Sequence, residues 1–358
     1  MGVTINNIGM PTPHPALLGL SVFSVGPAAG GGGSADNIIT AHATTPFTTA
    51  YPWSSGFGTK YSDPATTPGS TGRGCTLSPS HAGFGVSAAP RFVGYPFSGS
   101  GFGTRYSDPA TVDTKNGYDS AVSSDEADIA FASQNSPRIY IYPISGSGFG
   151  TKYSDPASVP GGTQEGTDFT ASDSDVFTAG AGSPYVHAWP WSGSGFGTKY
   201  SNPGTLPPGN LYAVRASDDG NEVTVGSGTT PYTVTYPWSG SGFGTKYSDP
   251  STLPPAICQG VHFNASTSDV SMAHNTSPYI SSYPWSSGYG TKHSAPGTAG
   301  GGIGYSITHS LDGAEVAMGH STSPYVSAYP FSGSGFGTKY SDPATTPTGT
   351  CRGISFNQ

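Results

Sequence analysis

One segment recurs seven times along the chain with little change. It reads YPWSGSGFGTKYSDP where it begins at Tyr236. Near-identical copies begin at Tyr51, Tyr95, Tyr142, Trp189, Tyr283 and Tyr329. The copies are 44 to 47 residues apart, which is at or a little above the length of one four-stranded propeller blade. The repeat therefore restricts the fold to an array of similar units, closed into a ring or stacked as a solenoid.

The last unit shows the expected make-up of one repeat. Four runs of seven or eight residues contain β-branched or aromatic side chains and are separated by turn sequences, which is typical of short strands. The runs are Ile303–Ser310, Ala314–His320, Tyr325–Phe331 and Gly337–Pro343. Between them stand Asp-Gly, Ser-Pro and a glycine-rich segment. The sequence therefore predicts an all-β fold, a seven-bladed β-propeller of four-stranded antiparallel blades.

The two ends of the repeat region look complementary, which favours a closed ring over a solenoid. The C-terminal residues CRGISFNQ (351–358) resemble the first strand of another unit, CQGVHFN (Cys258–Asn264), whereas the first unit begins with a second strand at Ala35. Closure removes exposed sheet edges. An alternative uses Leu18–Val25 as the first strand of that unit. We predict a propeller over residues 34–358 and an extended N-terminal arm over residues 1–33.

Composition supports a folded β protein and excludes several other classes. Gly and Pro make up 54 and 33 of 358 residues, but 12% of residues are aromatic and only 9% charged, unlike disordered chains. The net charge of −8 gives no general attraction for nucleic acid. There is no apolar run of membrane-spanning length, we identify no signal peptide, and three cysteines cannot form a disulfide framework.

The repeated polar motifs favour structural interpretations. The GSGFGTK string lacks the Gly-Lys-Ser/Thr ending of a phosphate loop. The Asp before Pro in each unit, replaced by Asn202 and Ala295 in two of them, is typical of a turn. His42, His274 and His320 share one position, and we expect hydrogen bonding there and not a metal site. We predict no catalytic residue, no cofactor and no bound metal.

One basic residue per unit forms a candidate interaction site within the repeats. Each follows the glycine-rich segment, and alternation along a strand points it away from the adjacent tyrosine or histidine. On an outer strand these residues would form a belt around the rim. The belt would protect a sheet edge or, as the alternative, dock an acidic partner. The residues are Lys60, Arg105, Lys152, Lys199, Lys246, Lys292 and Lys339.

The order of strands, Asp-Gly turn and Ser-Pro turn resembles WD-repeat β-propellers, although the Gly-His and Trp-Asp dipeptides are not kept. The SGFGTKYSDP repeat itself resembles propeller-forming structural proteins of tailed bacteriophages. That resemblance implies a non-enzymatic virion component, such as a capsid decoration, head fibre or tail protein, located in the virion. Its partners would be other virion or assembly proteins, bound through residues 1–33.

Two other functions remain open at the level of sequence. A carbohydrate-binding propeller that recognises a host surface glycan would use tryptophans for stacking, although their shared repeat position favours packing between blades. These are Trp53, Trp191, Trp238 and Trp285. A propeller hydrolase is disfavoured, because the repeats look uniform and no polar departures from the consensus gather in one place.

Overall fold

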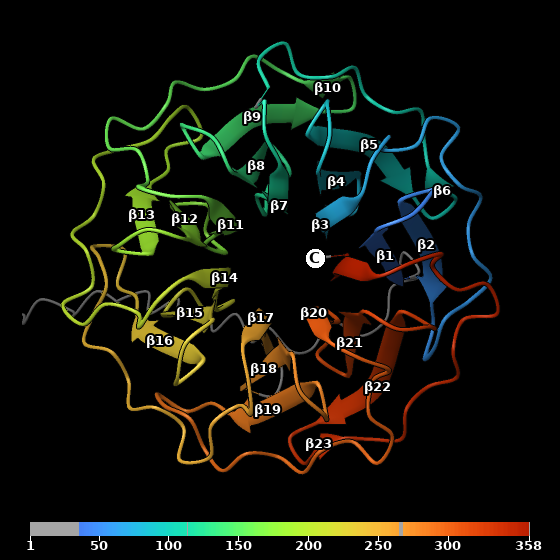
Figure 1. The fold of residues 1–358 in the computed structure, drawn as a ribbon. Helices are drawn as coiled ribbons and strands as arrows, with labels where there is room; N and C mark the ends of the chain where they lie inside the picture. The colour runs from blue at the N-terminus through green and yellow to red at the C-terminus, as the bar shows by residue number, and fades with distance from the viewer. Residues whose placement is uncertain (1–35, 113, 265–267, 358) are drawn as a thin grey trace, which may run out of the picture. The chain divides into compact units, whose positions relative to one another are not determined.

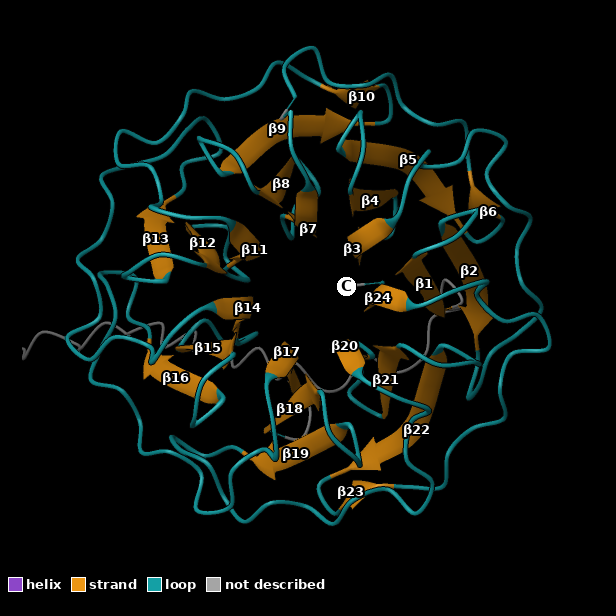
Figure 2. Ribbon diagram, in the orientation of Figure 1, coloured by secondary structure: helices purple, strands orange, loops and turns teal. Residues whose placement is uncertain are grey.

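The computed structural model describes residues 36–112, 114–264 and 268–357. Within these ranges every regular element is a β-strand. The strands form seven antiparallel sheets, which stand like blades around a central axis (Figures 1 and 2). The predicted all-β, seven-bladed propeller is confirmed. The predicted N-terminal arm, residues 1–33, lies outside the described residues.

The first strand of each sheet lines the central channel (Figure 1). Adjacent inner strands run in the same direction, as the parallel bridge between Leu77 and Asn357 shows. All seven inner strands therefore begin at one end of the channel and finish at the other. They are β24 (Cys351–Phe356), β3 (Gly72–Leu77), β7 (Gly117–Val122), β11 (Gln164–Phe169), β14 (Leu211–Ala216), β17 (Cys258–Asn264) and β20 (Gly304–His309).

The second and third strands carry the core. Nearly every second strand is buried along its whole length, because neighbouring blades cover both of its faces. The second strands are β1 (Asp36–His42), β4 (His81–Val86), β8 (Asp128–Ser133), β12 (Asp175–Gly180), β15 (Glu222–Ser227), β18 (Asp269–His274) and β21 (Glu315–His320). The third strands are β2 (Thr48–Trp53), β5 (Phe92–Ser98), β9 (Ile139–Ser145), β13 (Val186–Pro190), β16 (Thr233–Pro237), β19 (Ile280–Pro284) and β22 (Val326–Ser332).

The outermost strand of each sheet is shorter than predicted and lies earlier in the repeat. In three sheets it is a two-residue strand, β6 (Gly101–Phe102), β10 (Gly148–Phe149) or β23 (Gly335–Phe336). In the other four it is a single antiparallel bridge such as Trp238 to Phe243. The expected strand Gly337–Pro343 does not form. This segment makes only a few backbone hydrogen bonds to the third strand, such as the one from Tyr340 N to Ala328 O.

The ring closes through the C-terminal strand, as predicted. The last inner strand, β24, pairs with β1 of the N-terminal sheet, in the order β2-β1-β24. Both edges of β1 are thus occupied, by β2 and β24. The alternative first strand, Leu18–Val25, lies outside the described residues. The hydroxyl of Tyr51 on β2 also donates a hydrogen bond to Thr345 O, 2.7 Å away, in the connector that leads from the last sheet to β24.

Candidate ligand site in the central channel

Each inner strand has an irregular register near its first residue. In β3, for example, Gly72 and Gly74 pair with consecutive residues of β4, and Arg73 is the extra residue of a bulge. A bulge leaves one residue unpaired and redirects its side chain. The second residues of the seven inner strands line a hollow of about 100 Å³ at this end of the channel. We name them the mouth ring: Arg73, Tyr118, Glu165, Tyr212, Gln259, Tyr305 and Arg352.

Two arginines of the mouth ring come from neighbouring inner strands, β3 and β24. The guanidinium of Arg73 lies over the Tyr118 ring, 4.7 Å from its centroid, and that of Arg352 lies over the Tyr305 ring at 4.8 Å. Neither arginine forms an ion pair within the described residues, and the buried Nε of Arg73 has no hydrogen-bond partner there. The tyrosines hold both cations in place without neutralising them.

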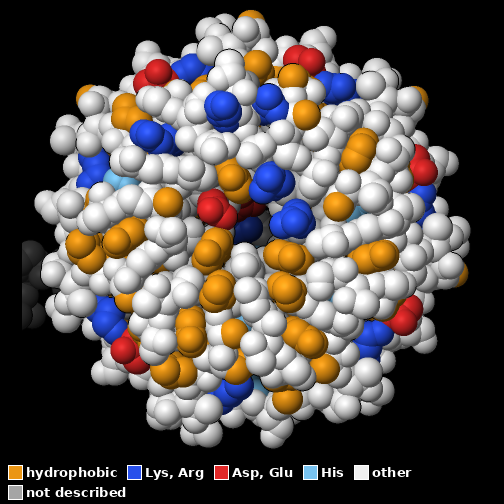
Figure 3. Space-filling model, in the orientation of Figure 1, with side chains coloured by type: hydrophobic (Ala, Val, Ile, Leu, Met, Phe, Trp, Pro, Cys, Tyr) orange, Lys and Arg blue, Asp and Glu red, His pale blue; other side chains and the backbone are white. Residues whose placement is uncertain are grey.

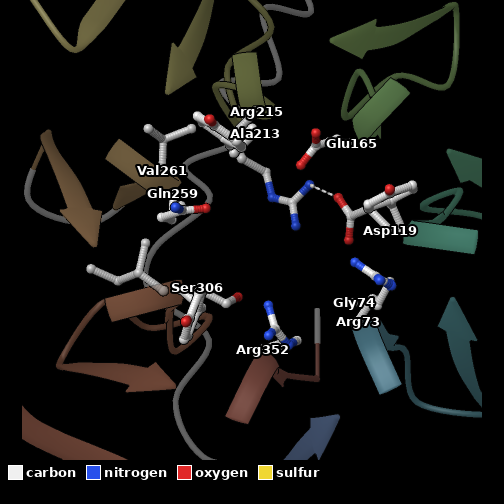
Figure 4. A pocket seen from close by; sticks show the side chains of 15 residues that line it. Arg73, Gly74, Asp119, Glu165, Ala213, Arg215, Gln259, Val261, Ser306 and Arg352 are labelled. Carbon is white, nitrogen blue, oxygen red and sulfur yellow. Dashed lines mark ion pairs between the residues drawn. The ribbon is translucent and has the colours of Figure 1, made fainter. Parts of the chain in front are cut away.

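The pictures show the same arrangement. In Figure 3 two basic side chains lie beside the central opening near β3 and β24, and an acidic one lies near β11. In Figure 4 the labelled side chains of Arg73, Arg352 and Glu165 point toward the centre of the channel. The hollow is therefore open to solvent and lined by charged groups.

Glu165 is the acidic member of the mouth ring. Burial raises the pKa of its carboxyl to about 7, and the positive charge of Arg73 lowers it only in part. A carboxyl group with a pKa near 7 can gain or lose a proton at neutral pH, which is what general acid or base catalysis requires.

Below the mouth ring, three charged side chains form a cluster in the wall of the channel: Arg215, Asp119 and Asp168. Arg215 on β14 lies 3.6 Å from Asp119 Oδ2 and 3.8 Å from Asp168 Oδ1. Its Nη1 also donates hydrogen bonds to Thr167 O and Val214 O. Burial raises the pKa of Asp119, and raises that of Asp168 to about 7, while Arg215 opposes both shifts. Unlike Arg73 and Arg352, Arg215 already has partners.

The predicted rim residues lie far out in the repeat, away from the channel. Five of them pair with the Asp three residues later, as Lys246 does with Asp249. Lys199 instead donates to Asn202 Oδ1 at 2.5 Å, and Lys292 has Ala295 at that place. The role of these residues as an interaction site stays a prediction.

The repeated histidines, for which hydrogen bonding was expected, and the repeated tryptophans, for which packing between blades was expected, are all buried. His42, His274 and His320 have no exposed surface, and burial lowers the pKa of each to about 4. His274 Nε2 lies 2.9 Å from Ser281 Oγ. No group of metal-ligating side chains occurs among the described residues. The four tryptophans are 3 to 7% exposed and cannot stack on a glycan.

Sequence reasoning missed the mouth ring. The outer parts of the repeats are uniform, but the inner strands differ, as GRGCTL, QEGTDF, LYAVRA and CRGISF show. Three of the six basic residues outside the rim lie on these strands. The inner strands were the place where polar departures from the consensus gathered.

The comparisons with known proteins identify the architecture. No protein-family profile matches the chain, and no curated protein does. A protein from Lactobacillus plantarum has 13% identity and a TM-score of 0.69, covering 90% of this chain and 100% of the other. A putative 6-phosphogluconolactonase from Bacteroides fragilis has 10% identity and a TM-score of 0.70, covering 91% and 98%.

A third similar structure is the hydrazine synthase of Kuenenia stuttgartiensis, with 10% identity and a TM-score of 0.55, covering 72% of this chain and 76% of the other. In total 1280 chains of solved structures match, so the architecture is common. At these identities the similarity shows the fold alone: the chain is a β-propeller.

The comparisons correct the predicted function. The chain was expected to be a non-enzymatic structural protein of a bacteriophage virion, and that expectation is wrong: the propellers described above are bacterial, and one is named as a putative lactonase. Nothing connects the repeat to a phage, and a virion location has no support. The physical reason for the error is that uniform outer repeats conceal inner strands with diverse charges. The described residues include no helix suited to crossing a membrane.

Proposed function

We propose that the mouth ring is an enzyme-like site for a small anionic metabolite with a phosphate or carboxylate group. The observation that carries the proposal is the pair Arg73 and Arg352, on adjacent strands and without a carboxylate partner in the described chain. Guanidinium groups match the geometry of carboxylate and phosphate oxygens. The arginines are also braced by Tyr118 and Tyr305, which reduces the entropy lost on binding.

Other residues that line the hollow suit a ligand with hydroxyl groups. Gln259, Tyr212 and Ser306 line the same hollow and offer hydrogen-bond donors and acceptors at fixed positions. A volume of about 100 Å³ holds the anionic group, with the remainder of the ligand on the rim of the hollow. The name of the Bacteroides fragilis neighbour, a putative 6-phosphogluconolactonase, agrees with a phosphorylated sugar acid as the ligand.

Lactone hydrolysis is a second candidate function, favoured by Glu165. With a pKa of about 7, its carboxylate can take a proton from a water molecule at neutral pH. The water oxygen attacks the lactone carbonyl carbon, the ring C–O bond breaks, and the former ring oxygen receives the proton. The product is the open-chain acid. Arg73, whose charge acts on Glu165, stabilises the negative charge on the carbonyl oxygen.

Calorimetry with three probes tests the binding site. We expect 6-phosphogluconate and gluconate to bind and glucose not to bind. Arg73→Gln and Arg352→Gln should each weaken 6-phosphogluconate binding by about tenfold or more, the loss of one charge-assisted contact. The matched control is Arg91→Gln, because Arg91 lies in the turn between β4 and β5 with its guanidinium donating to Ser87 O and Thr114 O. Equal affinity in all four proteins would refute the site.

Hydrolysis is measured separately, with 6-phosphogluconolactone in a pH-stat. We expect the protein to accelerate ring opening above the buffer rate and Glu165→Gln to remove most of that acceleration, with 6-phosphogluconate binding retained. The control Asp63→Asn changes one carboxylate on the rim, paired with Lys60, and should have no effect. A rate equal to that of buffer rejects the hydrolase but not the binding site.

A further inference from the structure

A second cavity, of about 300 Å³, opens at the other end of the channel. Its lining includes residues at the final ends of the inner strands, such as Phe169, the last residue of β11, and Phe263 near the end of β17. The turns between first and second strands complete it, with Asp218 and Leu311 among them. Arg215 is common to the walls of both cavities. We name this second space the acidic cavity.

Carboxylates outnumber cations around the acidic cavity. Four acidic residues line it, Glu126, Asp168, Asp173 and Asp218, against one basic residue, Arg215. Its two histidines add no positive charge at neutral pH, because burial lowers the pKa of His262 to about 4 and lowers that of His309 well below its usual value. The mouth ring has the opposite balance, with Arg73 and Arg352 against Glu165. The two ends of one channel therefore attract ligands of opposite charge.

The carboxylates differ in how many hydrogen-bond donors or cations of the protein they already contact. Glu126 accepts hydrogen bonds from Ser80 N and Oγ, and Asp173 accepts from Ser124 N and Oγ. These two hold neighbouring turns together. Asp218 is exposed and stands beside Asp219, and both burial in the concave surface and that neighbouring charge raise the pKa of its carboxyl. Asp218 is thus in a position to gain from a cation that the described chain does not supply.

Part of the cavity wall is apolar. Phe169, Phe263, Val122 and Leu77 contribute to it. Leu311, on the turn between β20 and β21, is 69% exposed, against 41% for Leu206 and 39% for Val159, the other exposed large apolar residues of the described chain. Because Leu311 lines the same cavity as Phe169 and Phe263, it adds to the apolar part of the wall.

We propose that the acidic cavity binds an organic cation with an apolar body, of the arylalkylamine class. The ammonium group lies against the carboxylate of Asp218, and the apolar body lies against Phe169, Phe263 and Leu311. A cavity of about 300 Å³ is at the lower limit for small-molecule sites, which suits a single ring with a short chain. This ligand is distinct from the anion proposed for the mouth ring and binds independently of it.

The test uses the whole chain and three probes of similar shape: 2-phenylethylamine, 2-phenylethanol and 3-phenylpropionate, which are cationic, neutral and anionic. Titration calorimetry should show the amine binding about tenfold more tightly than the alcohol, the effect of one ion pair in a partly enclosed site, and the acid not binding. The amine affinity should fall as salt is added. Equal binding of all three probes, or no binding of the amine, would overturn the proposal.

Two variants locate the site, each with a matched control. Asp218→Asn should weaken amine binding about fivefold to tenfold, whereas Asp342→Asn on the rim should not. Leu311→Ser should weaken both the amine and the alcohol, whereas Leu206→Ser should weaken neither. The double variant Arg73→Gln, Arg352→Gln should keep full amine affinity, which separates this site from the mouth ring. Unchanged amine affinity in Asp218→Asn and Leu311→Ser would contradict the assignment, and both residues are exposed enough for the variants to fold.

Discussion

Trp238 donates a hydrogen bond from its indole Nε1 to Oδ2 of Asp175, 3.1 Å away, across the boundary between two neighbouring sheets. The other oxygen of Asp175 accepts a bond from the hydroxyl of Tyr200 at 2.7 Å. One sheet earlier, Asp128 accepts bonds from Trp191 and Tyr153 in the same way. The aspartate at the start of the second strand thus connects the tyrosine that follows the outermost strand of its own sheet to the tryptophan of the next sheet.

The Trp238 bond predicts a measurable loss of stability. Trp238→Phe removes the donor and leaves a buried carboxylate oxygen with one partner fewer, so we expect it to lower the free energy of unfolding by about 1 to 2 kcal/mol beyond the loss of ring volume. Trp53→Phe is the control for that volume, because Trp53 is equally buried but its Nε1 has no partner in the described chain. Urea denaturation of both variants gives the difference, and equal losses would show that the hydrogen bond contributes nothing.

Closure by β24 predicts that the last eight residues are needed for a stable ring. Removing residues 351–358 takes away the buried side chains of Ile354 and Phe356, which together contribute about 3 to 6 kcal/mol, and exposes an edge of β1. We expect a large fall in Tm and self-association on size-exclusion chromatography. A synthetic peptide CRGISFNQ should restore the Tm, and a scrambled peptide should not. A truncated chain as stable as the full one would be incompatible with this pairing.

The sequence was sufficient to predict the architecture because seven near-identical copies of the repeat can be recognised in it. Turn residues recur at fixed places, and the C-terminal CRGISF matches the inner strand CQGVHF, so both the number of blades and the closure could be predicted. The outer strand was placed too late, at Gly337–Pro343, because alternation of Lys339 and Tyr340 looks like a strand. In the structure Lys339 instead pairs with Asp342 and Tyr340 reaches Glu315.

The candidate site could not be predicted in the same way. Arg73, Glu165 and Arg352 occupy equivalent positions in three repeats, separated by about 90 to 190 residues of chain, and each looks like a single departure from the consensus. Only the closed arrangement of the seven blades brings these three residues to one hollow. The bulge that directs them there depends on pairing between β3 and β4 and its equivalents, which the sequence pattern does not show.

Glu165 predicts a dependence of stability on pH. Burial raises the pKa of its carboxyl from 4.5 to about 7 in the folded protein. The folded state then holds the proton more tightly, so the stability contributed by this group falls as pH rises from about 4.5 to 7. Glu165→Gln removes that penalty. The variant should therefore gain stability over the natural chain at pH 8 and little at pH 4, measured by urea denaturation.

Glu126 provides a control of opposite sign. Burial alone would raise the pKa of its carboxyl, but hydrogen bonds from Ser78 and Ser80 outweigh burial and lower it. Its contribution to stability is present above the ordinary pKa and lost as pH falls. Glu126→Gln should therefore be less stable than the natural chain at pH 8 and nearly equal to it at pH 4. If both variants showed the same pH trend, the assignment of the shifts would be wrong.

Lys339 and Asp342 on the rim are expected to contribute unequally to stability. The side chain of Lys339 is 15% exposed and that of Asp342 is 47% exposed, so the lysine stem is covered while the ion pair faces solvent. Exposed ion pairs contribute about 0 to 1 kcal/mol, whereas a packed stem contributes through buried area. Asp342→Ala and Lys339→Met should thus each change the free energy of unfolding by less than about 1 kcal/mol. Lys339→Ala should cost more than either, by roughly 1 kcal/mol, and equal effects of Lys339→Met and Lys339→Ala would assign the contribution to charge instead of packing.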